Sequence, residues 1–257
     1  GGARRWLRLG VLSFQVSEFV KVCLVIFLAH FLAKKADRVK EWRIFVPPLL
    51  IVGILAGLVL KQPDFGTAVL MVGLMLFLLY LAGCRLLHLG ILFAAFIPAA
   101  VFLVWQKSYR LARWKTFLDP WQDPQKSGFQ IIQSFLSFGS GGAFGVGLGD
   151  GMQKLFYLPE PHTDFILSII GEETGLIGIA AVITLFAVLI CRGFMIAFRV
   201  PDLFGSLLAS GLTILIAMEA FINIAGVMGL VPTKGMALPF VSYGGTSLIM
   251  SLALVGI

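Results

Sequence analysis

Charged side chains are scarce in this chain. Lys, Arg, Asp and Glu together make up 13% of its 257 residues, whereas 59% are hydrophobic. Soluble globular proteins normally contain about 25% charged residues. The composition therefore excludes a soluble globular domain, and we expect an all-α, polytopic membrane protein.

Histidine and cysteine are also rare, which excludes several kinds of site. The three histidines, His30, His88 and His162, are scattered over different segments, so they lack the spacing of a zinc site. The three cysteines lie in or beside apolar runs and show neither disulfide nor metal-ligand spacing. We therefore expect the cysteines to be small buried side chains, and we expect no tightly bound cofactor.

Negative charge is in short supply as well. The chain has 20 Lys and Arg against 13 Asp and Glu, a formal net charge of +7. In a membrane protein such an excess indicates anionic lipids or phosphorylated substrates. No module that reads nucleic-acid bases is visible, so we expect no nucleic-acid partner. The glycine-dense stretch GSGGAFGVGLGDG at 139–151 follows no strand, which excludes a dinucleotide site and favours a close-packed turn.

Apolar runs long enough to cross a bilayer recur along the chain. A spanning helix needs about 20 mostly apolar residues. We interpret the whole chain, 1–257, as one transmembrane domain and as a fragment of a longer protein. The predicted spans are roughly 13–33, 44–61, 66–83, 86–105, 165–190 and 204–230, with a truncated one from about 245.

One connection, 106–164, is much longer than the others. Charge counting over the short loops places the LAKKADRVKEWR loop in the cytoplasm and the long loop outside. Within the long loop, FQIIQSFLSFG near 129–139 has the periodicity of an amphipathic helix. Such a helix either lies in the plane of the membrane interface or packs on the bundle.

Ionisable side chains gather on the predicted outer face or just inside the membrane from it. An ionisable group where a chain enters a membrane is expensive to keep, so function is its default explanation. Asp164 is a lone carboxylate at the mouth of an apolar helix. The other candidates are Arg4, Arg5, Glu18, Lys21, Asp64, Arg110, Glu160, His162, Lys234 and Ser242.

Several of these candidates also have a structural interpretation. Glu18 and Lys21, one helical turn apart, can form an ion pair, and Asp64 and Asp164 can each cap the helix that follows. Taken together, however, cations from separate segments suit a diphosphate, and an isolated carboxylate suits a general base.

Motifs along nearly the whole chain resemble one family. They are GARRW, FQVSEFVK, QPDFGT, FLDPWQDP followed by SGFQIIQS, YLPEPHTDFI followed by GEETGLIG, and LVPTKGMALPFVSYGGTS. In this order they resemble the SEDS family (shape, elongation, division and sporulation). PTKG and DPWQDP are more similar to its division-type and sporulation-type members than to its elongation-type member. The chain departs from the family's FQPSEF at Val16, and Phe156 stands where some division-type members have glutamate.

The resemblance implies a SEDS-like helical bundle of about ten spans in the bacterial cytoplasmic membrane, with about seven in this fragment. It implies a peptidoglycan glycosyltransferase that polymerises lipid II during cell division. Its expected partners are a class B penicillin-binding protein, which is a transpeptidase, and other divisome membrane proteins. Asp164 matches the family's essential aspartate, which lies in the long extracytoplasmic loop.

The expected reaction is inverting glycosyl transfer with Asp164 as general base. Its carboxylate would deprotonate the 4-hydroxyl of the acceptor sugar, and the resulting oxygen would expel polyprenyl diphosphate from the donor. A divalent cation, Mg²⁺ or Mn²⁺, could share the stabilisation of that leaving group. The expected diphosphate ligands are Arg4, Arg5, Lys21, Arg110 and Lys234, and the supporting residues are Glu18, Asp64, Glu160, His162 and Ser242.

Two other functions stay open. A lipid II flippase would carry polar residues in mid-span, and Glu219 and Asn223 fit that pattern weakly. We interpret this pair as structural, because polar side chains commonly bridge membrane helices. The other alternative is a divisome scaffold without chemistry.

Overall fold

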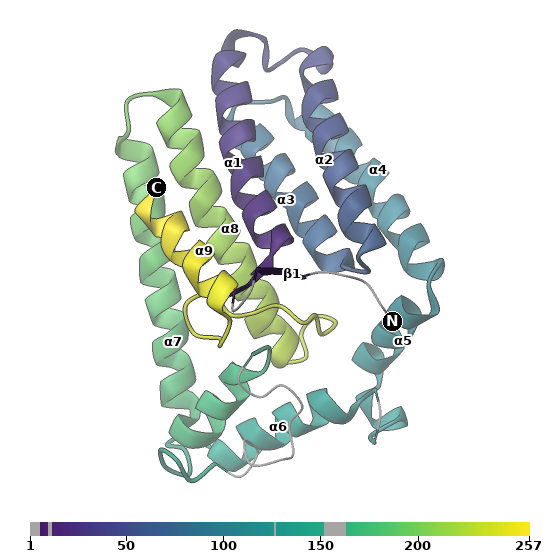
Figure 1. The fold of residues 1–257 in the computed structure, drawn as a ribbon, viewed down its shortest axis with the longest axis vertical. Coiled ribbons are helices and arrows are strands. Elements are labelled where there is room, and N and C mark those ends of the chain that lie inside the picture. Colours follow the sequence, from purple (N-terminus) through teal and green to yellow (C-terminus); the bar gives the residue numbers. More distant parts are fainter. Residues whose placement is uncertain (1–5, 10–11, 126, 152–162) are drawn as a thin grey trace. The chain divides into compact units, whose positions relative to one another are not determined.

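The computed structural model describes residues 6–9, 12–125, 127–151 and 163–257. Four of the predicted site residues, Arg4, Arg5, Glu160 and His162, lie outside these residues. The described elements are shown in Figure 1. They are β1 (Trp6–Leu9), β2 (Leu12–Gln15), α1 (Val16–Lys34), η1 (Ala36–Arg38), η2 (Trp42–Phe45), α2 (Val46–Lys61), α3 (Phe65–Leu81), α4 (Leu86–Trp105), α5 (Ser108–Leu118), η3 (Pro120–Gln122), α6 (Phe129–Gly141), α7 (Ile166–Arg199), α8 (Leu203–Val227) and α9 (Gly245–Gly256).

Helices that can cross a bilayer dominate the described chain. Five are long and apolar enough by length and composition: Val16–Lys34, Trp42–Lys61, Leu86–Trp105, Ile166–Arg199 and Leu203–Val227. Two shorter apolar helices are Phe65–Leu81 and Gly245–Gly256. Each corresponds to a predicted span, which confirms the expected helical class. The protein is a multi-pass membrane protein.

A short hairpin precedes the first span and was missed by the sequence analysis. β1 pairs antiparallel with β2, with Trp6 opposite Gln15 and Leu9 opposite Leu12. The predicted span began at 13, but α1 begins at Val16. The physical reason is visible in Leu12–Gln15, which alternates apolar and polar residues as a strand does.

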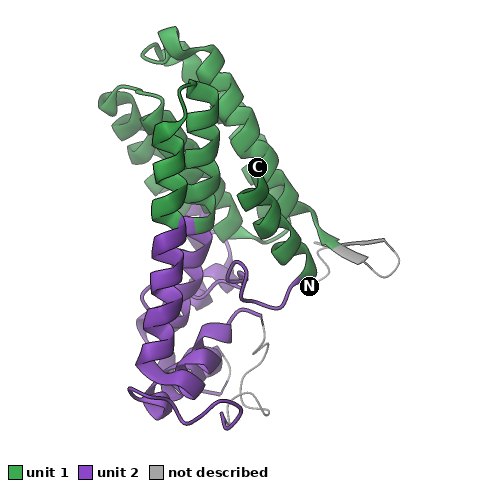
Figure 2. Ribbon diagram, turned by 90° about the vertical axis from the view of Figure 1, so that its left-hand side faces the viewer, with its two compact units in different colours: residues 1–101, 190–216, 245–257 green, residues 102–189, 217–244 purple. Residues whose placement is uncertain are grey.

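The chain divides into two compact units (Figure 2). Unit 1 contains 1–101, 190–216 and 245–257, and unit 2 contains 102–189 and 217–244. In unit 1, α3 packs against α1 and α2, and α9 packs against α1 and β2. The core of this unit includes Leu70, Leu74 and Leu78 of α3, which recur every helical turn and are fully buried.

In unit 2, the amphipathic helix α6 packs by a face that contains small polar side chains. Ser134 and Ser137 are fully buried, while Leu136 is 50% exposed. The hydroxyl of Ser134 lies 2.8 Å from that of Ser168 on α7 and donates to the carbonyl of Val227, also at 2.8 Å. The expected packing of this helix on the bundle is therefore observed, while its placement in the plane of the membrane interface stays a prediction.

The helix α7 is interrupted at Gly175, whose backbone (φ 66°, ψ −161°) is not helical. The glycine-dense stretch supplies hydrogen bonds at this break. The amides of Val146 and Gly147 donate to the carbonyls of Glu172 and Glu173, at 3.0 and 3.1 Å. A broken helix in a membrane is tolerated only where such main-chain groups find partners.

Main-chain amides of α7 also donate hydrogen bonds back to the glycine-dense stretch. The amides of Leu176 and Ile177 donate to the carbonyls of Gly142 and Ala143, at 3.0 and 3.3 Å. A side chain at Gly175 would lie 2.5 Å from the Ala143 carbonyl oxygen. The prediction of a close-packed turn in this stretch is confirmed, because only glycine lets the two main chains approach this closely.

Candidate active site

Asp164 lies in a turn of unit 2 immediately before α7, and its side chain is partly exposed. The turn is anchored by apolar neighbours: Phe165 and Leu167 are buried in one cluster with Val227. The amide of Ser168 donates to the carbonyl of Phe165 at 3.0 Å, so the first helical turn closes just after the aspartate. The sequence thus predicted the place of this carboxylate correctly, at the mouth of a span.

Two side chains from elsewhere in unit 2 hold the main chain around Asp164. The side-chain amide of Asn223, on α8, donates to the carbonyls of Asp164 (2.9 Å) and Met236 (2.6 Å). The hydroxyl of Ser242 donates to the carbonyl of Thr163 at 2.5 Å. Asn223 is 2% exposed and Ser242 is 6% exposed, so the two side chains that donate these bonds are buried.

The carboxylate itself faces the loop that carries the PTKG motif, residues 232–242. A Cβ atom placed on Gly235 would lie 2.7 Å from Oδ2 of Asp164. Lys234, the next residue in the chain, is half-buried, and its carbonyl accepts from the amide of Met236 at 2.6 Å. The structure therefore brings Asp164 together with the segment that contains two other predicted site residues, Lys234 and Ser242.

The PTKG loop is held in a strained conformation. Phe240 has φ 64°, in the left-handed region that a bulky side chain rarely adopts. Two hydrogen bonds between Leu238 and Ser242 close the loop around it. The amide of Leu238 donates to the Ser242 hydroxyl at 2.7 Å, and the amide of Ser242 donates to the Leu238 carbonyl at 3.0 Å. Such strain costs about 1–3 kcal/mol and clusters at functional sites.

Arg110 has protein partners of its own. Its side chain is buried, and its Nε donates to the Tyr109 hydroxyl at 2.8 Å. Its Nη1 donates to the carbonyl of Leu103 at 2.6 Å. The bond to Leu103 ties the start of α5 to the end of α4. A structural role is therefore visible for Arg110, while its binding of a diphosphate stays a prediction.

Two predicted structural interactions are present in unit 1. Nζ of the buried Lys21 lies 2.7 Å from Oε1 of Glu18. Asp64 is the N-cap of α3, since its carboxylate accepts from the amide (3.1 Å) and the hydroxyl (2.8 Å) of Thr67. The ion-pair and capping interpretations are both confirmed, and any further role of these residues toward a diphosphate stays a prediction.

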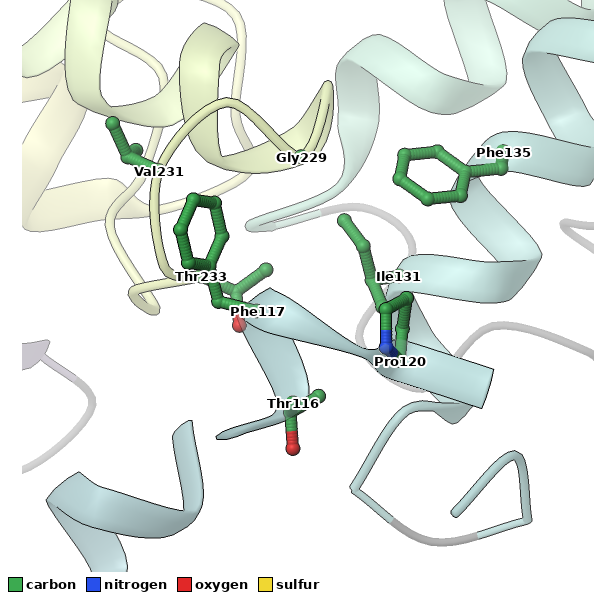
Figure 3. A pocket seen from close by; sticks show the side chains of 8 residues that line it. All are labelled: Thr116, Phe117, Pro120, Ile131, Phe135, Gly229, Val231 and Thr233. Carbon is green, nitrogen blue, oxygen red and sulfur yellow. The ribbon is translucent and has the colours of Figure 1, made fainter. Parts of the chain in front are cut away.

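A small apolar pocket lies beside the PTKG loop within unit 2 (Figure 3). Its volume of about 80 Å³ is well below the roughly 300–1,000 Å³ of typical ligand pockets. It is therefore too small to be the site of a glycolipid. Its lining residues come from α5, η3, α6 and the segment after α8: Thr116, Phe117, Pro120, Ile131, Phe135, Gly229, Val231 and Thr233.

A resident metal ion has no visible ligand set in the described part of the chain. No group of three or more His, Cys, Asp or Glu side chains is placed to hold one there. The described part of the site contains the Asp164 carboxylate, the PTKG loop with Lys234, and the side chains of Asn223 and Ser242.

Sequence reasoning missed two residues of this site, Asn223 and Gly235. A signal for Asn223 existed, because it is a polar side chain within an apolar span, four residues after the buried Glu219. It was expected to bridge helices, and it instead joins α8 to two non-helical segments. Nothing in the sequence alone says that Gly235 faces Asp164.

The fold and the site define a class: a multi-pass helical membrane protein with a carboxylate held at the mouth of a broken span. Comparison with known proteins gives the family. The model of the cell cycle proteins FtsW, RodA and SpoVE matches residues 1–257, and the chain belongs to this family.

Named relatives align with this protein over its whole given sequence. It is 48% identical over 257 residues to the probable peptidoglycan glycosyltransferase FtsW of Geobacter sp. (strain M18), covering 100% of this chain and 70% of that protein. It is 46% identical over 257 residues to the stage V sporulation protein E of Bacillus subtilis (strain 168), with the same coverage of 100% and 70%.

Solved structures agree with the fold. One solved structure is described as "Structural coordination of polymerization and crosslinking by a peptidoglycan synthase complex". One of its chains superposes on this protein with a TM-score of 0.80 and 31% sequence identity, over 100% of this chain and 72% of that one. The rod shape determining protein RodA of Thermus thermophilus gives a TM-score of 0.67 and 28% identity, over 100% of this chain and 68% of that one.

Proposed function

We propose that this protein is a peptidoglycan glycosyltransferase of the bacterial cytoplasmic membrane that polymerises lipid II during cell division. The observation that carries the proposal is the placement of the Asp164 carboxylate against the PTKG loop, with its main chain held by buried side chains. Relatives named probable peptidoglycan glycosyltransferase FtsW support the same reaction.

Asp164 acts as the general base. Its carboxylate takes the proton of the acceptor's 4-hydroxyl as that oxygen attacks the anomeric carbon of the donor. The bond from that carbon to the diphosphate oxygen breaks on the opposite face, so the configuration inverts and polyprenyl diphosphate leaves. The proton then passes from Asp164 to water. A base that is fixed in place contributes orientation as well as proton transfer.

Cations stabilise the leaving diphosphate, because its charge develops as the bond breaks. Lys234 is the foremost candidate, since it precedes Gly235, the residue that faces Asp164. Arg4, Arg5, Lys21 and Arg110 are the further candidates. A divalent cation that arrives with the diphosphate, Mg²⁺ or Mn²⁺, is compatible with this arrangement and needs no resident metal site.

The partner that we propose is a class B penicillin-binding protein, together with other divisome membrane proteins. The solved chain that superposes with a TM-score of 0.80 belongs to a peptidoglycan synthase complex in which polymerization and crosslinking are coordinated. Polymerisation by this chain would supply the strands, and the transpeptidase would crosslink them.

One observation favours the alternative of a lipid transporter. Discontinuous spans form the binding sites of many transporters, and α7 is broken at Gly175. However, the main-chain groups of Glu172, Glu173, Leu176 and Ile177 at this break are bonded to the glycine-dense stretch. They are therefore already occupied, and we favour the enzyme.

The deciding experiment is polymerisation of purified lipid II by the full-length protein with its partner. Asp164→Asn removes the base but keeps a residue that caps helices about equally well. We expect the variant to fold normally and its turnover to fall about 10²–10⁴-fold. A stable Asp164→Asn protein with near wild-type turnover would overturn the assignment and direct attention to Glu160 and Asp64.

Asp202→Asn is the matched control. Asp202 also precedes a span, and its carboxylate accepts from the amide of Gly205 at 2.6 Å at the start of α8. The same chemical change there should leave both folding and turnover near wild type, because Asn can keep the cap.

The alternative function makes a different prediction. A flippase would retain lipid II translocation in vesicles when Asp164 is replaced.

A further inference from the structure

We infer that Asn223, Ser242 and Gly235 are positioning residues that set the direction in which the Asp164 carboxylate points. This role rests on the proposed function, in which Asp164 is the base. Three separate observations support it: two hydrogen bonds from buried side chains to consecutive carbonyls, and a glycine whose missing side chain leaves room for the carboxylate.

The two hydrogen bonds act on the two sides of the Asp164 Cα atom. The Thr163 carbonyl belongs to the peptide plane before this atom, and the Asp164 carbonyl belongs to the plane after it. Because each peptide group is planar, fixing both carbonyls fixes φ and ψ of Asp164. The direction of its Cα–Cβ bond follows from these angles. Ser242 holds the first plane and Asn223 holds the second.

The same two side chains also hold the PTKG loop. Asn223 uses its other amide hydrogen on the carbonyl of Met236, and Ser242 accepts from the amide of Leu238. The turn that carries Asp164 and the loop that it faces are therefore fixed to the same atoms. Any shift of one relative to the other must stretch a buried hydrogen bond.

The side chain of Asn223 carries a cost in folding stability. Its Oδ1 is buried and has no hydrogen-bond partner among the residues that the structure describes. A buried acceptor without a partner costs about 1–3 kcal/mol. Its two donors impose a geometry that no apolar side chain could, since only a donor can hold both carbonyls.

Gly235 acts on the carboxylate itself. A methyl group there would lie 2.7 Å from Oδ2 of Asp164, which is closer than a carbon and an oxygen can approach. The nearby atom is the end of a rotatable side chain, so it can turn away at little cost in stability. Gly235→Ala should therefore displace the carboxylate while the fold is kept.

The test measures kcat and KM for lipid II with the full-length protein and its partner. We expect Gly235→Ala to lower kcat about 10–100-fold with little change in KM or melting temperature, because displacements near 1 Å can cost about 10²-fold. The pH at which turnover rises should also shift, since the carboxylate moves. Gly139→Ala is the matched control. Gly139 lies in the same unit as Gly235, and no atom lies within 4 Å of a Cβ placed on it.

A double-mutant cycle separates positioning from a general structural effect. If Gly235 and Asn223 act through Asp164, Gly235→Ala and Asn223→Ala should cost no further activity in the Asp164→Asn background. Additive losses there would overturn the inference. So would wild-type kcat in Gly235→Ala, which decides the matter even if Asn223→Ala does not fold.

The same measurements distinguish failure of this inference from failure of the proposed function. If Asp164→Asn is inactive while Gly235→Ala and Asn223→Ala behave as wild type, only the inference fails. If wild type does not polymerise lipid II, or Asp164→Asn polymerises it normally, the proposed function fails and the inference fails with it.

Discussion

Lys21 and Asp64 in unit 1 differ from the polar side chains around Asp164 in unit 2 in how far along the chain their described partners lie. In unit 1, Lys21 pairs with Glu18 and Asp64 bonds Thr67, each three residues away. Around Asp164 in unit 2, the corresponding separations are 59 residues for Asn223 and 79 residues for the Ser242–Thr163 bond. A local bond stabilises its own helix, whereas a distant bond fixes the placement of one segment relative to another.

This difference predicts what substitutions should change. Loss of a local bond in unit 1 should lower stability and leave the site geometry largely as it was. Loss of a distant bond around Asp164 should alter activity more than stability.

Lys21→Met should destabilise the protein strongly. It leaves Glu18 as a mostly buried carboxylate without its described partner, and breaking such a pair costs about 3–5 kcal/mol. The double variant Glu18→Gln, Lys21→Met should recover much of this loss. Thermal unfolding in detergent measures both. Equal stability of the single and double variants would contradict the ion-pair role.

The same variants test the predicted diphosphate role of Lys21. If Lys21 is purely structural, the double variant recovers turnover together with stability. If it also binds the leaving group, stability returns but lipid II polymerisation does not. The comparison between the units would then have to be abandoned for this residue.

Gly175→Ala should destabilise by at least the cost of its strained backbone. Its φ of 66° and ψ of −161° are conformations that only glycine adopts readily, and strain of this kind costs about 1–3 kcal/mol. The added methyl also meets the main chain of Ala143 and Gly145, each at 2.5 Å. A lowered melting temperature is the expected result.

Gly53→Ala is the control for this substitution. Gly53 also lies in a predicted span, on α2, and nothing lies within 4 Å of its missing Cβ. The control should be neutral or slightly stabilising, because alanine favours helices more than glycine does. A tolerated Gly175→Ala would show that the contact between the glycine-dense stretch and α7 is not tight.

The spans could be predicted from the sequence to within a few residues at most ends. Length and hydropathy decide them, because a bilayer imposes both. The exceptions have physical causes. α7 runs on to Arg199 although the prediction ended at 190, and its break at Gly175 depends on hydrogen bonds to residues about thirty positions earlier.

The candidate site could be predicted only in part, because it also depends on contacts between residues that are far apart in the sequence. Asp164 was found because a carboxylate at the mouth of a span is conspicuous in the sequence. The local partners of Lys21 and Asp64 followed from helical spacing. Asn223 and Gly235 could not be assigned, since their roles arise from contacts between segments that sequence spacing does not reveal.

Asp64→Ala should have a smaller effect than the changes at Lys21 and Gly175. It removes the N-cap of α3, which typically costs about 0.5–2 kcal/mol. Asp64→Asn should be close to neutral, because Asn caps about as well. The melting temperatures of the two variants provide the measurement. A large loss of turnover in a stable Asp64→Asn protein would assign Asp64 to the chemistry and break the local character of unit 1.

Cys84 should give the smallest effect, one on reactivity only. It lies between α3 and α4 and is buried as expected, whereas the same expectation is wrong for Cys23 and Cys191, which are exposed. Burial raises the pKa of the Cys84 thiol from 9.0 to about 11. At pH 8 its alkylation should be about 100-fold slower than in denatured protein, because the thiolate is the nucleophile. Since the folded pKa is the higher one, any stabilisation from the protonated thiol is complete below pH 9 and is lost as the pH rises through about 11. The measurement is the rate of iodoacetamide labelling in a Cys23→Ser, Cys191→Ser background, whose turnover should be unchanged. Equal labelling of folded and denatured protein at pH 8 would show that the turn around Cys84 opens, and that unit 1 is less firmly packed there than its local contacts indicate.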